Sequence, residues 1–409
     1  MRVLILTNLY PNPYQPNRAV FNRQQFRALA EQHAVRIIAP LSWVDELLSR
    51  AKGNLRLPRD RQRSSDGIPV EHPRYWYTPG AMRGWHGHFY RRSVQHAFQR
   101  ALKEFCPDIL LASWAYPDGW AAVKLARRAG LPVVIKVHGC DVLCAGRGLD
   151  QNPLRKRRTI EALCGADAII AVSRHLAENV IDLGVDPERV KVVQNGVDCA
   201  LFHPNSKAAA RAKLGLDPAE RILLFVGNLE LVKGLDVLME AFARLVQAGL
   251  RFRCLLIGQG SMRQQLERQS ACLGLTETVR FIGPIPHVRL PEWYCAADLL
   301  VLPSRSEGVP NVLLEAAACR TPFVATRVGG IPEIAHLGAS RLVPPGDPAA
   351  LAQAIRDVLT VFADEPLHRS WGALRSHDET AAELVSVFSR VLRSRRRVRL
   401  APVLLQSAR

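Results

Sequence analysis

Short apolar runs recur along this 409-residue chain, with helical stretches between them. Those in the first half are Arg2–Thr7, Val35–Ala39, Ile109–Ala112, Val133–Val137, Ala168–Val172 and Val190–Val193. Those in the second half are Ile222–Val226, Cys254–Ile257, Val279–Ile282, Leu299–Leu302, Phe323–Ala325 and Arg341–Val343. The runs are continuously apolar instead of alternating, which is typical of parallel strands covered on both faces. Strands that alternate with helices predict doubly wound α/β units, and two such sets predict two Rossmann-like domains.

The boundary between the two domains is expected in the polar, proline-containing stretch from about Cys199 to Pro218. We therefore assign residues 1–200 to the first domain and residues 201–375 to the second. Residues 376–409 are expected to form a C-terminal helix, near Ala381–Leu392, and a basic tail. The length of the chain is sufficient for two hydrophobic cores.

Residues 45–100 do not follow this alternation of predicted strands and helices, and they are expected to form an irregular insertion. Their aromatic side chains Trp76, Tyr77, Trp85, Phe89 and Tyr90 lie among Arg74, Arg83, Arg91 and Arg92. Aromatic and arginine side chains together suit the headgroup layer of a membrane, a sugar or a nucleic acid. An insertion that packs its own aromatic side chains is an equally good interpretation.

The positive charge of the chain is concentrated in its first half. Residues 1–175 hold 27 Lys and Arg against 13 Asp and Glu, a net charge of +14 out of the total of +18. A polyanionic partner would explain this imbalance, whether nucleic acid, an anionic membrane surface or a phosphorylated substrate. A solvated, arginine-rich surface is the alternative without a partner.

The cysteines and the apolar runs indicate a reduced, cytoplasmic setting. The nine cysteines are odd in number and scattered, and no apolar run approaches the ~18 residues of a membrane-spanning helix. The opening run is too short for a signal peptide and is expected to be a buried strand. His138, Cys140 and Cys144 lie close together, but no second ligand pair follows at zinc spacing, so we expect no metal site.

In open parallel sheets, ligands bind where strands end and helices begin, which selects a few loops of this chain. After the run Ile222–Val226, Gly227 would let a ligand approach the backbone, and Lys233 would reach phosphate oxygens. Gly234 then precedes a helical pattern. A P-loop is excluded because its motif is absent, and an ordinary strand-to-helix turn is the alternative.

Glu307 and Glu315 enclose the sequence GVPNVLL in the next such loop. On one helix they would lie ~80° apart and share no face. If the helix starts from Asn311 as its N-cap, Glu307 and the turn from Gly308 to Pro310 lie in the preceding loop, and Glu315 lies one turn in. Two carboxylates and an anion-binding turn then suit a ligand with hydroxyls and phosphates, which describes a nucleotide sugar. The structural alternative is an exposed Glu307 and a Glu315 that stabilises the helix dipole.

Two further loops are candidates. The run Val133–Val137 places His138 at the end of a strand in the first domain, beside Gly139 and Asp141, where a histidine can act on a substrate. Gly329 and Gly330 after the run Phe323–Ala325 make another loop that a ligand could approach closely.

At these residues the sequence resembles the retaining glycosyltransferases of family four, which have the GT-B fold, and in particular their bacterial exopolysaccharide and cell-envelope members. The second-domain segments that carry the resemblance are VGNLELVKG, GQGSMRQQLE, VRFIGPIP, YCAADLLVLPSRSEG, SEGVPNVLLEAAAC, VGGIPEI and LVPPGDPAALAQAI. VQNGVDCALFHP resembles the stretch that enters the interdomain link, and VHGCDV and AVSRHLAENV resemble first-domain segments. Residues 45–100 contribute little. The resemblance implies a cleft between the two domains and a C-terminal helix that crosses back to the first domain.

The resemblance also implies a role for each candidate residue. His138 and Glu307 would be the catalytic residues, with Glu307 holding hydroxyls of the transferred sugar and His138 reaching the sugar or phosphate from the first domain. Glu315 would bind the ribose hydroxyls and Lys233 the diphosphate. The rest of the donor site would be Gly227, Asn228, Gly308, Val309, Pro310 and Asn311. First-domain loop residues on the acceptor side would be Asn17, Ala19 and Asp141.

The implied reaction moves a hexose-type sugar from a nucleoside diphosphate sugar, UDP or GDP, to a lipid-linked or polysaccharide acceptor. Members of this family retain the anomeric configuration by same-face attack, so no protein nucleophile or cofactor is expected. No metal is expected either, because the chain lacks the Asp-x-Asp motif of metal-dependent transfer. The expected location is cytoplasmic, or peripheral on the inner face of the plasma membrane. A GT-B sugar-nucleotide epimerase and a non-enzymatic polyanion-binding protein are the alternatives, and no nucleic-acid motif supports a nucleic-acid partner.

Three positions depart from the family pattern. Asn228 stands where many members have an arginine, and we hypothesise that Arg305 supplies the missing charge. Ala19 and Arg320 each stand where a glycine is common.

Overall fold

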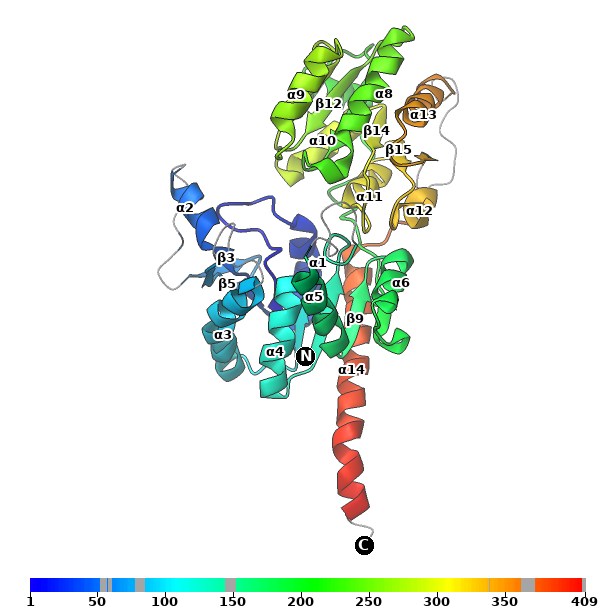
Figure 1. Ribbon diagram of the computed structural model, residues 1–409. Helices are drawn as coiled ribbons and strands as arrows, with labels where there is room; N and C mark the ends of the chain where they lie inside the picture. The colour runs from blue at the N-terminus through cyan, green and yellow to red at the C-terminus, as the bar shows by residue number, and fades with distance from the viewer. Residues whose placement is uncertain are drawn as a thin grey trace. The chain divides into compact units, whose positions relative to one another are not determined.

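The structure, a computed structural model, describes residues 1–51, 57, 61–77, 85–143, 152–337, 339–361 and 372–406. The chain forms two compact units (Figure 1). Unit 1 comprises Met1–Asn195 and His377–Arg409, and unit 2 comprises Gly196–Ser376.

Unit 1 is built on an eight-stranded sheet in the order β10-β9-β8-β7-β1-β2-β5-β4. Its strands are β1 (Arg2–Leu6), β2 (Ala34–Ile38), β4 (Gln62–Ser65), β5 (Ile68–Glu71), β7 (Ile109–Ala112), β8 (Val133–Val137), β9 (Ala168–Ala171) and β10 (Val190–Val192). Neighbouring strands are parallel except β4 and β5, and β3 (Leu41–Ser42) pairs separately with β6 (Arg74–Tyr75). The central strands β7, β8 and β9 are buried along their whole length, as their apolar sequences predict.

The helices of unit 1 cover this sheet. They are α1 (Val20–Gln32), α2 (Trp43–Ala51), α3 (His86–Glu104), α4 (Trp120–Ala129), α5 (Pro153–Gly165), α6 (Arg174–Asp182) and α14 (His377–Gln406), with the short helical segments η2 (Ala115–Gly119) and η4 (Pro187–Arg189). Side chains cap several of these helices at their first turn. Ser42 accepts from Asp45 N at the start of α2, Asn152 from Arg155 N at the start of α5, and Ser173 from Leu176 N at the start of α6.

The prediction of an irregular insertion at residues 45–100 is wrong for the described part of that segment. It contains most of α2, the strands β4, β5 and β6, and most of α3, and β5 extends the main sheet beside β2. The buried side chains of α3, Tyr90, Val94, Ala97, Phe98 and Ala101, recur at helical spacing. The basic and aromatic residues between them obscured that pattern. Residues 52–56, 58–60 and 78–84, which include Arg83, lie outside the described residues.

Unit 2 is built on a six-stranded, all-parallel sheet in the order β13-β12-β11-β14-β15-β16. Its strands are β11 (Ile222–Val226), β12 (Arg253–Ile257), β13 (Val279–Gly283), β14 (Leu299–Leu302), β15 (Phe323–Thr326) and β16 (Ser340–Val343). Its helices are α7 (Lys207–Leu214), α8 (Leu235–Gln247), α9 (Arg263–Cys272), α10 (Leu290–Ala296), α11 (Asn311–Ala318), α12 (Ile331–Ile334) and α13 (Pro348–Val361), with η5 (Leu231–Lys233), η6 (His287–Arg289) and η7 (Ala335–Leu337). The strands that the apolar runs predict in both halves are confirmed within one residue at each end.

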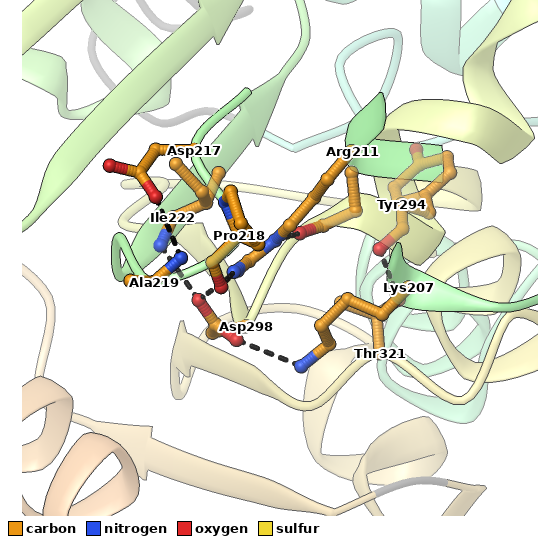
Figure 2. A network of polar contacts seen from close by, with 10 residues as sticks. Lys207, Arg211, Asp217, Pro218, Ala219, Ile222, Tyr294, Asp298 and Thr321 are labelled. Carbon is orange, nitrogen blue, oxygen red and sulfur yellow. Dashed lines mark hydrogen bonds and ion pairs between the residues drawn. The ribbon is translucent and has the colours of Figure 1, made fainter. Parts of the chain in front are cut away.

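The polar stretch in which we expected the domain boundary contains helix α7, which is fixed to the sheet by Asp298. Figure 2 shows Lys207 and Arg211 converging on this carboxylate. Lys207 Nζ lies 2.8 Å from Asp298 Oδ1, and Arg211 Nη2 lies 2.7 Å from Oδ2, which also accepts from Ile222 N. Arg211 is almost fully buried, and its other nitrogens donate to the carbonyls of Ala296 and Pro218. The entry to unit 2 is therefore anchored at the start of β11.

The last helix, α14, returns to unit 1, as the family resemblance implies. Ala381, Leu384, Val387, Phe388 and Val391 belong to the same buried cluster as residues of α1 and of the unit 1 sheet. Arg395 adds a two-bond ion pair with Asp167, at 2.8 and 3.0 Å. Unit 1 is thus completed by a segment that follows unit 2 in the sequence.

No described helix is both long enough and apolar enough to cross a membrane. No group of three or more His, Cys, Asp or Glu side chains in the described ranges is placed to hold a metal ion, and Cys144 lies outside these ranges.

Candidate functional site

Three of the candidate loops of unit 2 leave the same edge of the sheet side by side. They follow β11, β14 and β15, which are neighbours in the sheet and parallel. The loops hold Gly227–Gly234, Pro303–Pro310 and Arg327–Gly330 respectively. Residues that are distant in the sequence therefore meet at one place, as expected for a ligand site at a parallel sheet.

Lys233 and Glu307 meet directly at this edge. Lys233 Nζ lies 2.6 Å from Glu307 Oε1, which also accepts a hydrogen bond from Ser304 Oγ at 2.6 Å. The Glu307 side chain is only 8% exposed, and that of Lys233 is 22% exposed. The lysine charge and the glutamate charge therefore compensate each other in a largely water-shielded position, and an arriving anion would compete with Glu307 for Lys233.

Two glycines allow these loops to pack together. A Cβ at Gly234 would lie 2.1 Å from the Pro303 carbonyl oxygen, and one at Gly329 would lie 1.8 Å from the Glu307 carbonyl oxygen. Both glycines have left-handed backbones, with φ of 65° and 55°. Gly330 N also donates to the Gly308 carbonyl at 2.8 Å. The Gly329–Gly330 loop, expected to approach a ligand, thus approaches the backbone that carries Glu307.

Glu307 and Glu315 lie in different elements, as predicted, but the helix starts differently. Pro310, not Asn311, is the N-cap of α11, and no side chain caps this end. Asn311 is the first helical residue. Proline is compatible with this position because its fixed φ suits a helix start. Gly308, Val309 and Pro310 are buried behind the start of α11.

Glu315 lies in α11 and is held by two side chains that the sequence reasoning missed. Tyr294 OH donates to Glu315 Oε2 at 2.7 Å, and His287 Nε2 lies 2.9 Å from Oε1. Burial, reinforced by the Glu315 charge, raises the pKa of Tyr294 well above its ordinary value, so the phenol stays protonated and donates. Phe202 packs against both rings, with centroids 5.0 Å from His287 and 6.0 Å from Tyr294. His287 directly follows the motif VRFIGPIP, and Tyr294 is the first residue of YCAADLLVLPSRSEG. Their places at these family motifs were the sequence signal that could have identified them.

Arg305 is not placed to replace an arginine at position 228. Its guanidinium makes two hydrogen bonds to Asp236, at 2.8 and 2.6 Å, and one to the Leu231 carbonyl. Burial opposes ionisation of Asp236, but the hydrogen bonds and the charge of Arg305, together with backbone N–H donors, outweigh it and lower the pKa of the carboxyl. The charge of Arg305 is therefore already matched. Asn228 is exposed at the same sheet edge.

His138 lies in unit 1, directly after β8, with its ring between Phe21 and Trp114 at centroid distances of 5.2 and 6.2 Å. Desolvation, and to a smaller extent the charge of nearby Lys136, lowers the pKa of His138 well below the ordinary value. The imidazole is therefore neutral at pH 7.

A chain of hydrogen bonds assigns the tautomer of His138. Asn22 Nδ2 donates to the Leu9 carbonyl at 2.8 Å, which directs Asn22 Oδ1 to accept from Ser113 Oγ at 3.2 Å. Because the Ser113 proton is then used, the 2.8 Å contact between Ser113 Oγ and His138 Nε2 is a donation from the imidazole. Nδ1 is left as the acceptor nitrogen of His138.

Asp141 holds the backbone around His138. It is 1% exposed, and its carboxylate accepts from the N–H groups of His138, Gly139 and Ala115 at 2.9 to 3.0 Å. Burial raises the pKa of Asp141 despite these hydrogen bonds. With its oxygens committed to the loop, Asp141 is placed to position His138.

The two unusual replacements of glycine both occur at left-handed positions. Ala19 has φ 47° at the N-cap of α1, and Arg320 has φ 58° just after α11. A Cβ in this region costs about 1–2 kcal/mol, which explains the family preference for glycine. Asn17 lies exposed in the loop before Ala19.

Comparison with known proteins covers both units. Residues 19–201 match the family described as Glycosyltransferase Family 4, and residues 220–361 match the one described as Glycosyl transferases group 1. A D-inositol 3-phosphate glycosyltransferase of Catenulispora acidiphila is 35% identical over 286 residues, covering 64% of this chain and 68% of that protein. The Bacillus subtilis protein named "Putative teichuronic acid biosynthesis glycosyltransferase TuaC" is 29% identical over 367 residues, covering 87% and 88%.

Solved structures show the same fold at low sequence identity. Sucrose-phosphate synthase from Thermosynechococcus elongatus superposes with a TM-score of 0.74 at 22% identity, over the whole of both chains. Anabaena Alr3699/HepE in complex with UDP-glucose gives 0.68 at 20% identity, covering 96% and 99%. Two α/β units with largely parallel sheets, the matched family segments and the identity to named glycosyltransferases lead to one assignment: the chain belongs to glycosyltransferase family four and has the GT-B fold.

Proposed function

We propose that this glycosyltransferase is a retaining hexosyltransferase. It moves a hexose-type sugar from a UDP- or GDP-sugar to a lipid-linked or polysaccharide acceptor, in the synthesis of an exopolysaccharide or another cell-envelope polymer. The observation that carries the donor half of the proposal is the meeting of Lys233 and Glu307 at one sheet edge, with Glu315 held in the helix that follows. The UDP-glucose complex of a structural neighbour supports the donor class, and the name of the Bacillus subtilis relative, a putative teichuronic acid biosynthesis glycosyltransferase, supports a polysaccharide acceptor.

The donor would be held by three groups of unit 2. Lys233 would exchange its contact with Glu307 for the diphosphate, and the freed carboxylate of Glu307 would accept from sugar hydroxyls. Glu315, oriented by Tyr294 and His287, would accept from the ribose hydroxyls. The backbone N–H groups of Gly308, Val309 and Asn311 would add donors to the sugar and phosphate. Gly227 and Asn228 would lie beside the phosphates.

The reaction would proceed on one face of the sugar. The bond from the anomeric carbon to the diphosphate oxygen breaks, the acceptor oxygen bonds to the same face, and the acceptor proton passes to the leaving phosphate. Lys233 would stabilise the charge that develops on the diphosphate, and neutral His138 would accept a hydrogen bond from a sugar hydroxyl through Nδ1 or its backbone carbonyl. No metal or cofactor enters this scheme. The proposed location is the cytoplasm, at the inner face of the plasma membrane.

A donor screen followed by an acceptor assay tests this function. UDP-, GDP- and ADP-sugars are compared by thermal stabilisation, where a ligand at 100 times its Kd stabilises by about 2.7 kcal/mol. The best donor is then incubated with lipid extracts and polysaccharide fragments, and the anomeric configuration of the product is read by NMR. Glu315→Ala should weaken donor binding, whereas the exposed Glu277→Ala should not.

Three outcomes would count against the proposal. Equal donor affinity for Glu315→Ala and the wild type would remove the ribose role. Conversion of the donor without transfer to any acceptor would indicate an epimerase. An inverted product would exclude the retaining mechanism.

A further inference from the structure

Unit 1 contains a pocket of about 450 Å³ between α3, α4 and α5, remote in sequence from the residues assigned above to the donor. Four basic side chains line it: Arg91 from α3, Lys124 from α4, and Arg157 and Arg158 from α5. Only one carboxylate, Glu161, is among the described residues that line it. The pocket therefore carries a net charge of about +3 at neutral pH.

The single carboxylate is already committed. Glu161 forms an ion pair with Lys124 and accepts from Trp120 Nε1 at 2.8 Å. Burial, together with the charges of Arg158, Arg91 and Lys124, lowers the pKa of His88, which also lines the pocket. His88 is therefore neutral, and the three arginine charges are not compensated from within the pocket.

The ring of Trp120 holds these charges in place. Trp120 is 4% exposed, and the Arg158 guanidinium and the Lys124 ammonium lie 5.4 and 5.7 Å from its ring centroid. The Nε of Arg91 is shielded from solvent and has no hydrogen-bond partner among the described residues. A shielded, unpaired N–H beside uncompensated charge is the environment that an anionic ligand would satisfy.

The stability of the helix does not explain this cluster. Arg155, Lys156, Arg157 and Arg158 fall in the first two turns of α5, the end at which the helix dipole disfavours cations.

Exposed apolar side chains border the pocket. Leu154 lines it and is 39% exposed. Trp85 is 55% exposed and contacts His88, with ring centroids 5.3 Å apart. A soluble phosphate would gain nothing from these two side chains. A lipid would, because tryptophan and leucine are favoured at the boundary between headgroups and acyl chains.

We propose that this pocket binds the phosphate group of an anionic membrane lipid, with Trp85 and Leu154 entering the headgroup layer. The surface involved is formed by α3, α4 and α5 and not by residues 45–100 as a whole. Arg158 also donates to Tyr116 OH at 3.3 Å, in the η2 segment that follows Trp114, whose ring contacts His138. A lipid bound here would lie near the loop that carries His138.

Vesicle binding of the full chain tests the proposal. Phosphatidylcholine vesicles with and without 30% phosphatidylglycerol are sedimented with wild type, with Arg91→Gln/Arg157→Gln, and with Arg127→Gln/Arg128→Gln. The last variant is a matched control, because Arg127 and Arg128 are exposed on α4 and do not line the pocket. The pocket variant should lose about 30-fold in partitioning onto the anionic vesicles, and the control much less. Trp85→Ala should also weaken binding.

Arg157→Glu provides a second test in case the Arg91 change impairs folding, since Arg157 is exposed. Nucleotide-sugar affinity, measured by calorimetry, should be unchanged in all these variants, which separates a failure of this proposal from a failure of the donor assignment. Equal losses in the pocket variants and the control, or equal binding to vesicles without phosphatidylglycerol, would overturn the proposal. The proposal would also be overturned if no variant bound vesicles and inorganic pyrophosphate stabilised the wild type but not the pocket variant.

Discussion

Replacement of Tyr294 by phenylalanine tests how Glu315 is held. The phenol is fully buried and donates to Glu315 Oε2 at 2.7 Å. Phenylalanine keeps the ring that packs against Phe202, so the change opens no large cavity. It removes one hydrogen bond to a charged group and leaves His287 as the remaining side-chain partner seen here.

The expected loss follows from the kind of bond removed. A hydrogen bond to a charged group contributes about 1.5–3 kcal/mol, whereas one between neutral groups contributes about 1 kcal/mol. Tyr294→Phe should therefore destabilise unit 2 by about 1.5–3 kcal/mol. On a Glu315→Gln background the same change should cost only about 1 kcal/mol, which gives a coupling of about 0.5–2 kcal/mol between the two residues.

Hydrogen exchange in urea is the appropriate assay, because a chain with two units need not unfold in one step. Exchange of the amides of α10 and α11 reports on the elements that carry Tyr294 and Glu315. An equal cost of Tyr294→Phe on both backgrounds would refute the charged hydrogen bond, and a cost below about 0.5 kcal/mol would refute the role of Tyr294 altogether.

The remaining predictions concern three other residues. His138→Ala should lower turnover about 100-fold with little change in donor affinity, and initial rates beside calorimetry would check both. Arg320→Gly should stabilise unit 2 by about 1 kcal/mol relative to Arg320→Ala in thermal unfolding, because only glycine removes the Cβ from a left-handed position; equal stability of the two variants would contradict this. Burial lowers the pKa of Lys136 to about 7, so between pH 7 and 10.5 the unfolded chain binds a proton that the folded chain does not. The free energy of unfolding of the wild type, measured relative to that of Lys136→Met, should therefore rise with pH between pH 7 and 10.5 and stay constant below pH 7.

Much of the fold could be predicted because its signal is local. A strand buried on both faces is apolar along its length, so central strands such as β7, β9, β11 and β14 were visible as uninterrupted apolar runs. The signal failed for β5 and α3. β5 is short and contains Pro69, and the apolar face of α3 is interrupted by basic and aromatic residues.

The family resemblance implied that the last helix returns to the first unit. The sequence by itself determined the two Rossmann-like units, the presence of a C-terminal helix, and the separation of Glu307 and Glu315 into a loop and a helix. Spacing and residue type are sufficient for these, because they reflect local periodicity and chain direction. Only the tertiary structure decided the pairing of Lys233 with Glu307, the partners of Glu315, and the engagement of Arg305 by Asp236. These contacts join residues 21 to 74 positions apart. At that sequence separation, strand order and loop packing decide which side chains come into contact. No local sequence pattern encodes these contacts.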